Sequence, residues 1–112
     1  MHQSTFFAKP GKADTAQSEQ IVIRALGEFQ FRGKILAGRE LPLDRLLGAL
    51  RRAAEGFDVA EITDEQIVNT LKALGANVRE IPSFIAKHPY RIIVNTELAE
   101  HALQVYRESH PS

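Results

Sequence analysis

The chain has 112 residues with 14 basic and 14 acidic side chains, so its formal net charge is zero. A chain of this length forms one domain and buries roughly two-thirds of its unfolded surface, which is enough for a single core. The absence of cysteine excludes disulfides, zinc–thiolate sites, iron–sulfur clusters and thiol nucleophiles. The neutral net charge produces no overall field that would attract nucleic acid or anionic lipid. The sequence lacks an apolar run that could span a membrane and the features of a signal peptide, so we expect a cytoplasmic protein.

The first twenty residues are mainly polar, and Phe6 and Phe7 are their adjacent apolar pair. A segment of this composition cannot bury enough apolar surface by itself to offset the entropy lost on ordering. We therefore expect an N-terminal arm over residues 1–20 and a single globular domain over residues 21–112. Such an arm is either flexible or lies on this domain or on a neighbouring chain.

Residues 21–36 are predicted to form a β-hairpin. Residues 21–26 are a continuous apolar run of strand length, and Gly27 permits a turn. Residues 28–36 then alternate between polar and apolar positions, with one face made of Phe29, Phe31, Gly33 and Ile35. Because successive side chains of a strand point to opposite faces, the alternation predicts a strand with one buried and one solvated face.

A helix is predicted over about residues 42–55. Pro42 lies in the first turn, where its missing amide proton costs little. One apolar stripe with helical spacing consists of Leu43, Leu46, Leu47, Leu50 and Ala54. Gly48 in a helix interior costs about 1 kcal/mol relative to Ala, so we expect it to mark a close packing contact.

The last third of the chain predicts a helix, two strands and a helix, at residues 63–74, 77–82, 90–95 and 97–109. The first of these helices begins with Thr63 and Gln66 in the positions of a capping box, and it ends at Gly75. Together with the predicted hairpin, these elements give an α+β fold. We expect a small, mainly antiparallel sheet with three helices packed on one face.

The sequence contains no recognisable catalytic or metal-binding motif. No two histidines have the spacing of a helical metal-binding pair, and no G-x-S-x-G is present. The two glycines of residues 33–40 have the spacing of a phosphate loop but lack its Lys and its Ser or Thr. We therefore expect a protein without catalytic residues, cofactor or bound metal.

The distribution of charge favours a protein-interaction module or small accessory subunit, which we expect to self-associate as a homodimer or other homo-oligomer or to dock on a larger protein. Residues 24–52 are rich in arginine, whereas residues 55–65 contain five acidic and no basic side chains. Such polarity pairs copies of a chain head to tail or matches an oppositely charged partner, although it is also compatible with an ordinary solvated surface. An apolar pair in the connection between the last two strands also suggests docking, because connections are usually polar. The candidate partner-binding residues are Phe84, Ile85, Arg51, Arg52, Phe6 and Phe7.

An alternative function comes from the helix, strand, connection and strand that span residues 63–95. This order resembles the recognition helix and wing of a winged-helix domain, which implies DNA binding through the major groove. The candidate nucleic-acid contacts are Gln66, Asn69, Lys72, Arg79, Lys87 and Arg91. Against this function, Asp64 and Glu65 at the helix start repel phosphate. Only one helix and a short connection precede it from Leu41 onward, whereas the full motif needs three helices. Winged helices also serve as protein-docking modules, so the shape alone does not imply nucleic acid.

Overall fold

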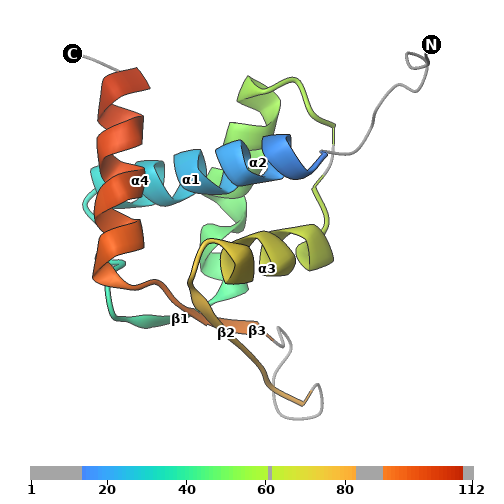
Figure 1. Ribbon diagram of the computed structural model, residues 1–112, viewed down its shortest axis with the longest axis vertical. Helices are drawn as coiled ribbons and strands as arrows, with labels where there is room; N and C mark the ends of the chain where they lie inside the picture. Colours follow the sequence, from blue (N-terminus) through green and yellow to red (C-terminus); the bar gives the residue numbers. More distant parts are fainter. Residues whose placement is uncertain (1–13, 61, 83–89, 110–112) are drawn as a thin grey trace.

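The computed structural model describes residues 14–60, 62–82 and 90–109. Within these ranges, four α-helices and a three-stranded antiparallel sheet confirm the predicted α+β class. The elements in chain order are α1 (Thr15–Phe31), β1 (Glu40–Pro42), the 3-10 segment η2 (Leu43–Leu46), α2 (Leu47–Gly56), α3 (Asp64–Ala73), β2 (Asn77–Glu80), β3 (Tyr90–Ile93) and α4 (Thr96–Ser109). Figure 1 shows the helices gathered on one side of the sheet, with α1 lying across the middle of the molecule.

The predicted β-hairpin over residues 21–36 is wrong, because residues 15–31 form the helix α1. The buried side chains recur at helical spacing: Ile21, Val22, Ala25, Leu26 and Phe29. A short apolar run is equally compatible with a buried strand and with one segment of a buried helix. Here the helix forms because α1 packs against α2, α3 and α4, which bury its apolar face.

The signal that begins α1 lies inside the segment that was predicted to be an arm. The Asp14 carboxylate accepts a hydrogen bond from the Gln17 amide at 2.8 Å, and the Gln17 side chain accepts one from the Asp14 amide at 3.2 Å. This capping box fixes the first turn, so residues 15–20 belong to the helix. Residues 1–13, including Phe6 and Phe7, lie outside the described residues.

Gly27 is the point at which α1 crosses α4. A Cβ atom on Gly27 would lie 2.5 Å from both the Ala102 carbonyl oxygen and the Tyr106 Cβ, so this residue is a packing glycine rather than the predicted turn. Beside it, the Gln30 side chain donates a hydrogen bond to the Ala99 carbonyl oxygen at 2.7 Å. Gly48 was expected to mark a close contact, but the nearest atom to its hypothetical Cβ is in the Arg52 guanidinium at 3.6 Å. That prediction is wrong.

The other predicted helices and strands are confirmed, with shifted ends. The helix predicted over residues 42–55 is divided into η2 and α2. Pro42 precedes both in an extended conformation, because it belongs to the edge strand β1 and pairs there with Arg91 of β3. The capping box of α3 is present as predicted, with the Thr63 side chain accepting from the Gln66 amide at 3.1 Å.

The sheet has the strand order β1-β3-β2, which makes β3 the central strand. The register aligns Leu41, Ile92 and Val78 across the three strands, and Leu41 and Ile92 are buried in the core. The largest fully buried side chains are Ile21, Leu26, Leu36, Leu46, Ile67, Leu71, Ile92, Val22 and Val94. The core therefore lies between α1, its neighbouring helices and the inner face of the sheet.

Candidate functional site

The connectivity of the first seven elements resembles that of a winged-helix domain. Three helices precede β2 and β3, a short strand lies between the first two helices, and β3 is the central strand of the sheet. The helix that was missing from the winged-helix interpretation of the sequence is α1, because its residues had been assigned to the predicted hairpin. The objection that too few helices are present is therefore removed. In this chain order α3 stands at the position that the recognition helix has in a winged-helix domain.

The exposed face of α3 does not have the charge that binding to phosphate requires. Asn69 and Lys72 are exposed, but so are Asp64 and Glu65 in the first turn. The Gln66 side chain accepts a hydrogen bond from the Thr63 amide at 2.9 Å as part of the capping box. Acidic side chains at a helix start complement the helix dipole and repel a nucleic-acid backbone.

The predicted basic residues of the strands are tied to the sheet. The Arg79 guanidinium lies 2.6 Å from the Glu40 carboxylate, so this ion pair joins the two edge strands across β3. The Arg91 side chain is half-buried and donates a hydrogen bond to the Tyr90 carbonyl oxygen at 3.4 Å. Lys87 lies outside the described residues. Arg79 and Arg91 are cross-strand partners on β2 and β3, and both side chains already have a partner within the chain, Glu40 for Arg79 and the Tyr90 carbonyl oxygen for Arg91.

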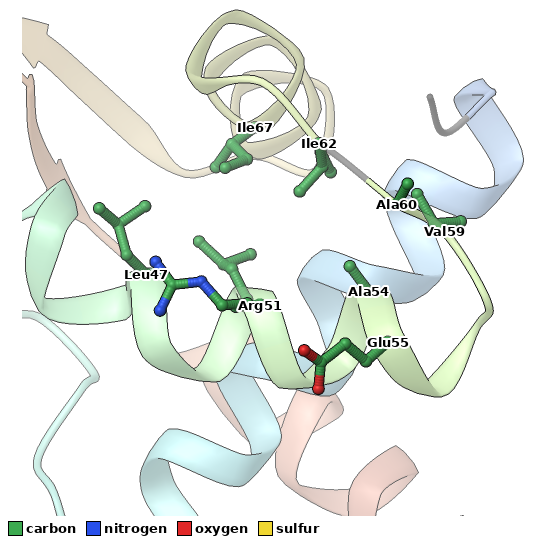
Figure 2. Close-up of a pocket in the computed structure, with 9 residues that line it drawn as sticks. Leu47, Arg51, Ala54, Glu55, Val59, Ala60, Ile62 and Ile67 are labelled. Atoms are coloured by element: carbon green, nitrogen blue, oxygen red, sulfur yellow. The ribbon is translucent and has the colours of Figure 1, made fainter. Parts of the chain in front are cut away.

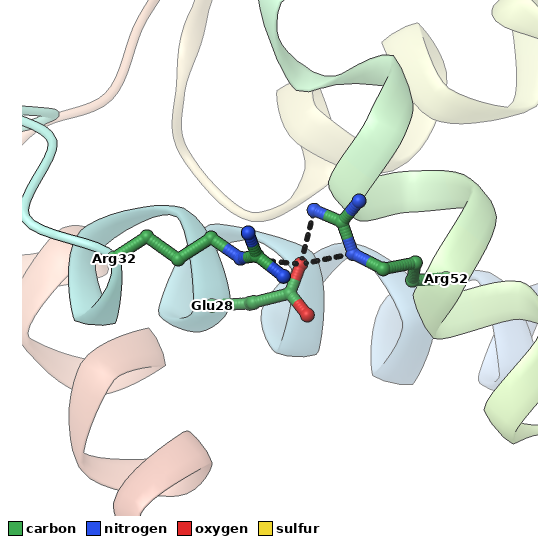
Figure 3. Close-up of polar contacts among 3 residues, drawn as sticks. All are labelled: Glu28, Arg32 and Arg52. Atoms are coloured by element: carbon green, nitrogen blue, oxygen red, sulfur yellow. Dashed lines mark hydrogen bonds and ion pairs between the residues drawn. The ribbon is translucent and has the colours of Figure 1, made fainter.

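Arg52, a predicted partner-binding residue, joins two helices of its own chain (Figure 3). Its Nε and Nη2 atoms donate hydrogen bonds to Glu28 Oε1 at 2.9 and 2.7 Å. Arg32 approaches the same oxygen at 3.8 Å. The hydrogen bond to Glu28 raises the pKa of the Arg52 guanidinium above its ordinary value. Arg52 therefore connects α2 to α1. The other predicted docking residues, Phe84, Ile85, Phe6 and Phe7, lie outside the described residues.

Arg51, the remaining predicted docking residue, lines a groove between α2 and the start of α3 (Figure 2). This α2–α3 groove has a volume of about 300 Å³. Its apolar lining consists of Leu47, Leu50, Ala54, Val59, Ala60, Ile62 and Ile67. Arg51 and Glu55 add one charge of each sign, one turn apart on α2.

The local structure explains why these side chains converge. Residues three and four apart on a helix share a face, so Leu47, Arg51 and Glu55 project on the same side of α2. Asp58 then takes a positive φ of 58°, which reverses the chain after α2. The reversal brings Val59 and Ala60 back along the groove before α3 begins.

Several exposed acidic residues lie in the chain next to residues that line the α2–α3 groove. Glu55 lines it directly, and Asp58 precedes the lining residue Val59. Asp64 and Glu65 follow Ile62 at the start of α3 and are also exposed. These residues belong to the acidic stretch identified in the sequence. That stretch therefore follows α2 and reaches the start of α3, the two elements between which the groove lies.

A second surface combines exposed apolar and basic side chains at the other end of α1. Phe31 is 55% exposed and Ile35 is 66% exposed; both were predicted to lie on a buried strand face, and that prediction is wrong. Arg32 and Lys34 lie between them in the chain and are exposed as well. The Phe31 ring is held by the Tyr106 ring, with 5.3 Å between their centroids. We call residues 31–35 the Phe31–Ile35 surface.

The sequence interpretation missed both surfaces for different reasons. The α2–α3 groove is assembled from residues 47–67 and depends on how two helices pack, which no local pattern encodes. The Phe31–Ile35 surface was visible as apolar residues, but the strand prediction assigned them to the core. Within the described part of the chain, no group of three or more acidic residues or histidines could hold a metal ion. The helices described are each too short or too polar to cross a membrane.

Comparison with known proteins adds no relative. No protein-family model matches the chain, and no curated protein or solved structure matches it significantly.

Proposed function

We propose that this protein is a non-enzymatic interaction module that binds a protein partner in the α2–α3 groove. The observation that carries the proposal is the apolar lining of the groove with charged side chains at its edge. Protein interfaces have this composition, with an apolar centre and a polar rim. The groove thus offers what the predicted docking function requires, and Arg51 is the predicted residue that lies in it.

The chemistry of the groove indicates what kind of segment it takes. Its volume of about 300 Å³ is at the lower end for a binding pocket and suits a few side chains rather than a large ligand. Its lining requires large apolar side chains on the partner. Glu55 in the lining and the exposed Asp58 and Asp64, which are close to lining residues in the chain, outnumber the single basic residue of the lining, Arg51, so these carboxylates favour basic residues on the partner. The expected partner segment therefore combines one or two large apolar residues with lysine or arginine.

Filling the groove with a bulky side chain is expected to abolish partner binding. Ala60 is exposed and lines the groove, so Ala60→Trp occupies the site without disturbing the core. Native mass spectrometry of the protein purified from its own cells should show a partner complex that this variant loses. The loss of affinity should be at least tenfold, while the free energy of unfolding changes by about 0.5 kcal/mol or less, as for other surface substitutions.

Ala16→Trp is the matched control, because Ala16 is an exposed alanine in the first turn of α1 and does not line the groove. This variant should retain the complex. A complex that survives Ala60→Trp would show that the partner binds elsewhere, and the proposed function of the groove would be wrong.

The second candidate function is DNA binding, which the winged-helix-like connectivity supports. The charge of α3 opposes it, so we expect duplex binding no tighter than micromolar at low salt. Lys72→Glu should change that weak binding no more than the control Lys34→Glu, which reverses a charge outside α3. An electrophoretic or fluorescence titration measures both. Submicromolar affinity that falls steeply with salt and depends on Lys72 would favour DNA binding instead.

A further inference from the structure

We infer that the partner of the α2–α3 groove is a second copy of this chain, which inserts its Phe31–Ile35 surface. This inference rests on the proposed function, since it names the occupant of the proposed site. Phe31 and Ile35 are the two large hydrophobic side chains that stand exposed in the described ranges. Large exposed apolar side chains that gather in one short stretch of the chain mark a candidate interaction site.

The two surfaces match in apolar character, and the acidic Glu55 of the groove complements the basic residues of the other surface, while Arg51 also lines the groove. One is a hollow lined by leucine, isoleucine, valine and alanine, and the other presents a phenylalanine and an isoleucine outward. Glu55 lines the hollow, and the exposed Asp58 and Asp64 lie near its lining residues in the chain, whereas the exposed Arg32 and Lys34 lie between Phe31 and Ile35 in the chain. The Phe31–Ile35 surface therefore has the combination of apolar and basic side chains that the groove requires.

Within one molecule the two surfaces cannot meet. Phe31 is the last residue of α1, and α1 has 17 residues, which corresponds to a length of about 25 Å. The first turns of α1 lie beside α3, because Asp14, Thr15 and Ser18 share a surface depression with Gln66, Asn69 and Thr70. Figure 1 places α3 and the α2–α3 connection at that end of α1, and it places α4 and the connection that follows α1 at the other end. Contact between the surfaces must therefore join two copies.

A contact between different surfaces of identical chains is heterologous, and in a pair held by one such contact one copy keeps its groove unused and the other keeps its protruding surface. Such contacts produce rings when the rotation closes and open assemblies when it does not. The participating surfaces are small compared with the roughly 1,200–2,000 Å² of a stable interface, so the contact is transient. We expect a dissociation constant in the micromolar range or weaker, and an affinity that decreases with salt because exposed charges are screened.

Sedimentation velocity of the full-length protein from micromolar to millimolar concentration tests the inference. The 12.5 kDa wild-type chain should form species larger than a dimer as its concentration rises. Ile35→Ser removes the protruding side chain, and Ala60→Trp fills the groove, so each variant alone should remain a monomer. Ile81→Ser, which removes another partly exposed isoleucine outside both surfaces, should associate as the wild type does.

Mixing the two variants distinguishes a contact between the groove and the Phe31–Ile35 surface from a contact between two identical surfaces. Ala60→Trp keeps its Phe31–Ile35 surface and Ile35→Ser keeps its groove, so one intact contact remains between them. An equimolar mixture should form a heterodimer of twice the monomer mass and nothing larger. Association of Ile35→Ser alone, or a monomeric mixture beside an associating wild type, would overturn the inference. Near-ultraviolet circular dichroism verifies that both variants are folded.

Two further outcomes identify the alternatives. The double variant Phe6→Ser, Phe7→Ser should associate like the wild type; loss of association would assign the groove to the N-terminal residues and overturn the inference. A wild type that stays monomeric at every concentration, while Ala60→Trp still abolishes a complex with another protein, would overturn the inference and leave the proposed function standing. An Ala60→Trp variant that loses neither would overturn both.

Discussion

Replacing Gly27 with Ala is expected to destabilise the protein by about 2 kcal/mol or more, the effect of forcing extra atoms into a packed contact. A Cβ atom there would lie 2.5 Å from the Ala102 carbonyl oxygen and from the Tyr106 Cβ, and neither belongs to the flexible end of a side chain. The helices α1 and α4 must therefore move apart. Alanine is the better helix former by about 1 kcal/mol, so the measured loss is the steric cost after that gain has been subtracted.

Urea denaturation followed by circular dichroism measures this loss as a change in the free energy of unfolding. Gly48→Ala is the matched control, since it is also a glycine within a helix but has 3.6 Å or more around its hypothetical Cβ. It should be neutral or stabilise by up to about 1 kcal/mol. Equal stability of Gly27→Ala and the wild type would contradict the close crossing of α1 and α4.

Phe29→Ala is expected to cost about 3–5 kcal/mol, as is usual for a buried phenylalanine. Phe29 is 4% exposed and belongs to the core. Phe31→Ala should cost about 1 kcal/mol or less, because Phe31 is 55% exposed and loses mainly its ring contact with Tyr106. The two residues are two positions apart, so a strand would place both on one face, whereas a helix separates them.

Thermal and urea denaturation of both variants test this difference. Similar losses of stability would support a strand and contradict α1. A large loss for Phe31→Ala alone would mean that the side chain is part of the core, and the Phe31–Ile35 surface would then not be available to a second copy.

The parts of the fold that were predicted correctly have signals close together in the chain. Thr63 and Gln66 define the start of α3, and Gly75, which has a φ of +101°, ends it. The region of α1 also has a local signal in the capping box of Asp14 and Gln17, but that signal lies in the segment predicted to be an arm, and the apolar run that follows it suits either a strand or a helix. The strand β1 has three residues and includes a proline, so it has no periodicity to recognise.

The residues of the candidate site also could not be assigned from the sequence alone. Arg51 and Arg52 were selected together for their charge, but adjacent helical positions point in different directions around the axis. Arg51 lines the α2–α3 groove, and Arg52 binds Glu28 of α1. The sequence could identify an arginine-rich segment, and only the packing of α2 distinguishes which arginine contacts a neighbouring helix.

The hydrogen bond between Gln30 and Ala99 has a consequence for how the protein is made. It joins residues 69 positions apart in the chain, and it lies at the crossing of α1 with α4. At a translation rate of about 5–20 residues per second, these two residues are synthesised roughly 3–14 s apart. During that interval the face of α1 around Gly27 lacks its covering helix. A nascent chain that has produced α1, α2 and α3 thus still exposes the face of α1 that α4 covers, and native packing of α1 is achieved only after translation of α4.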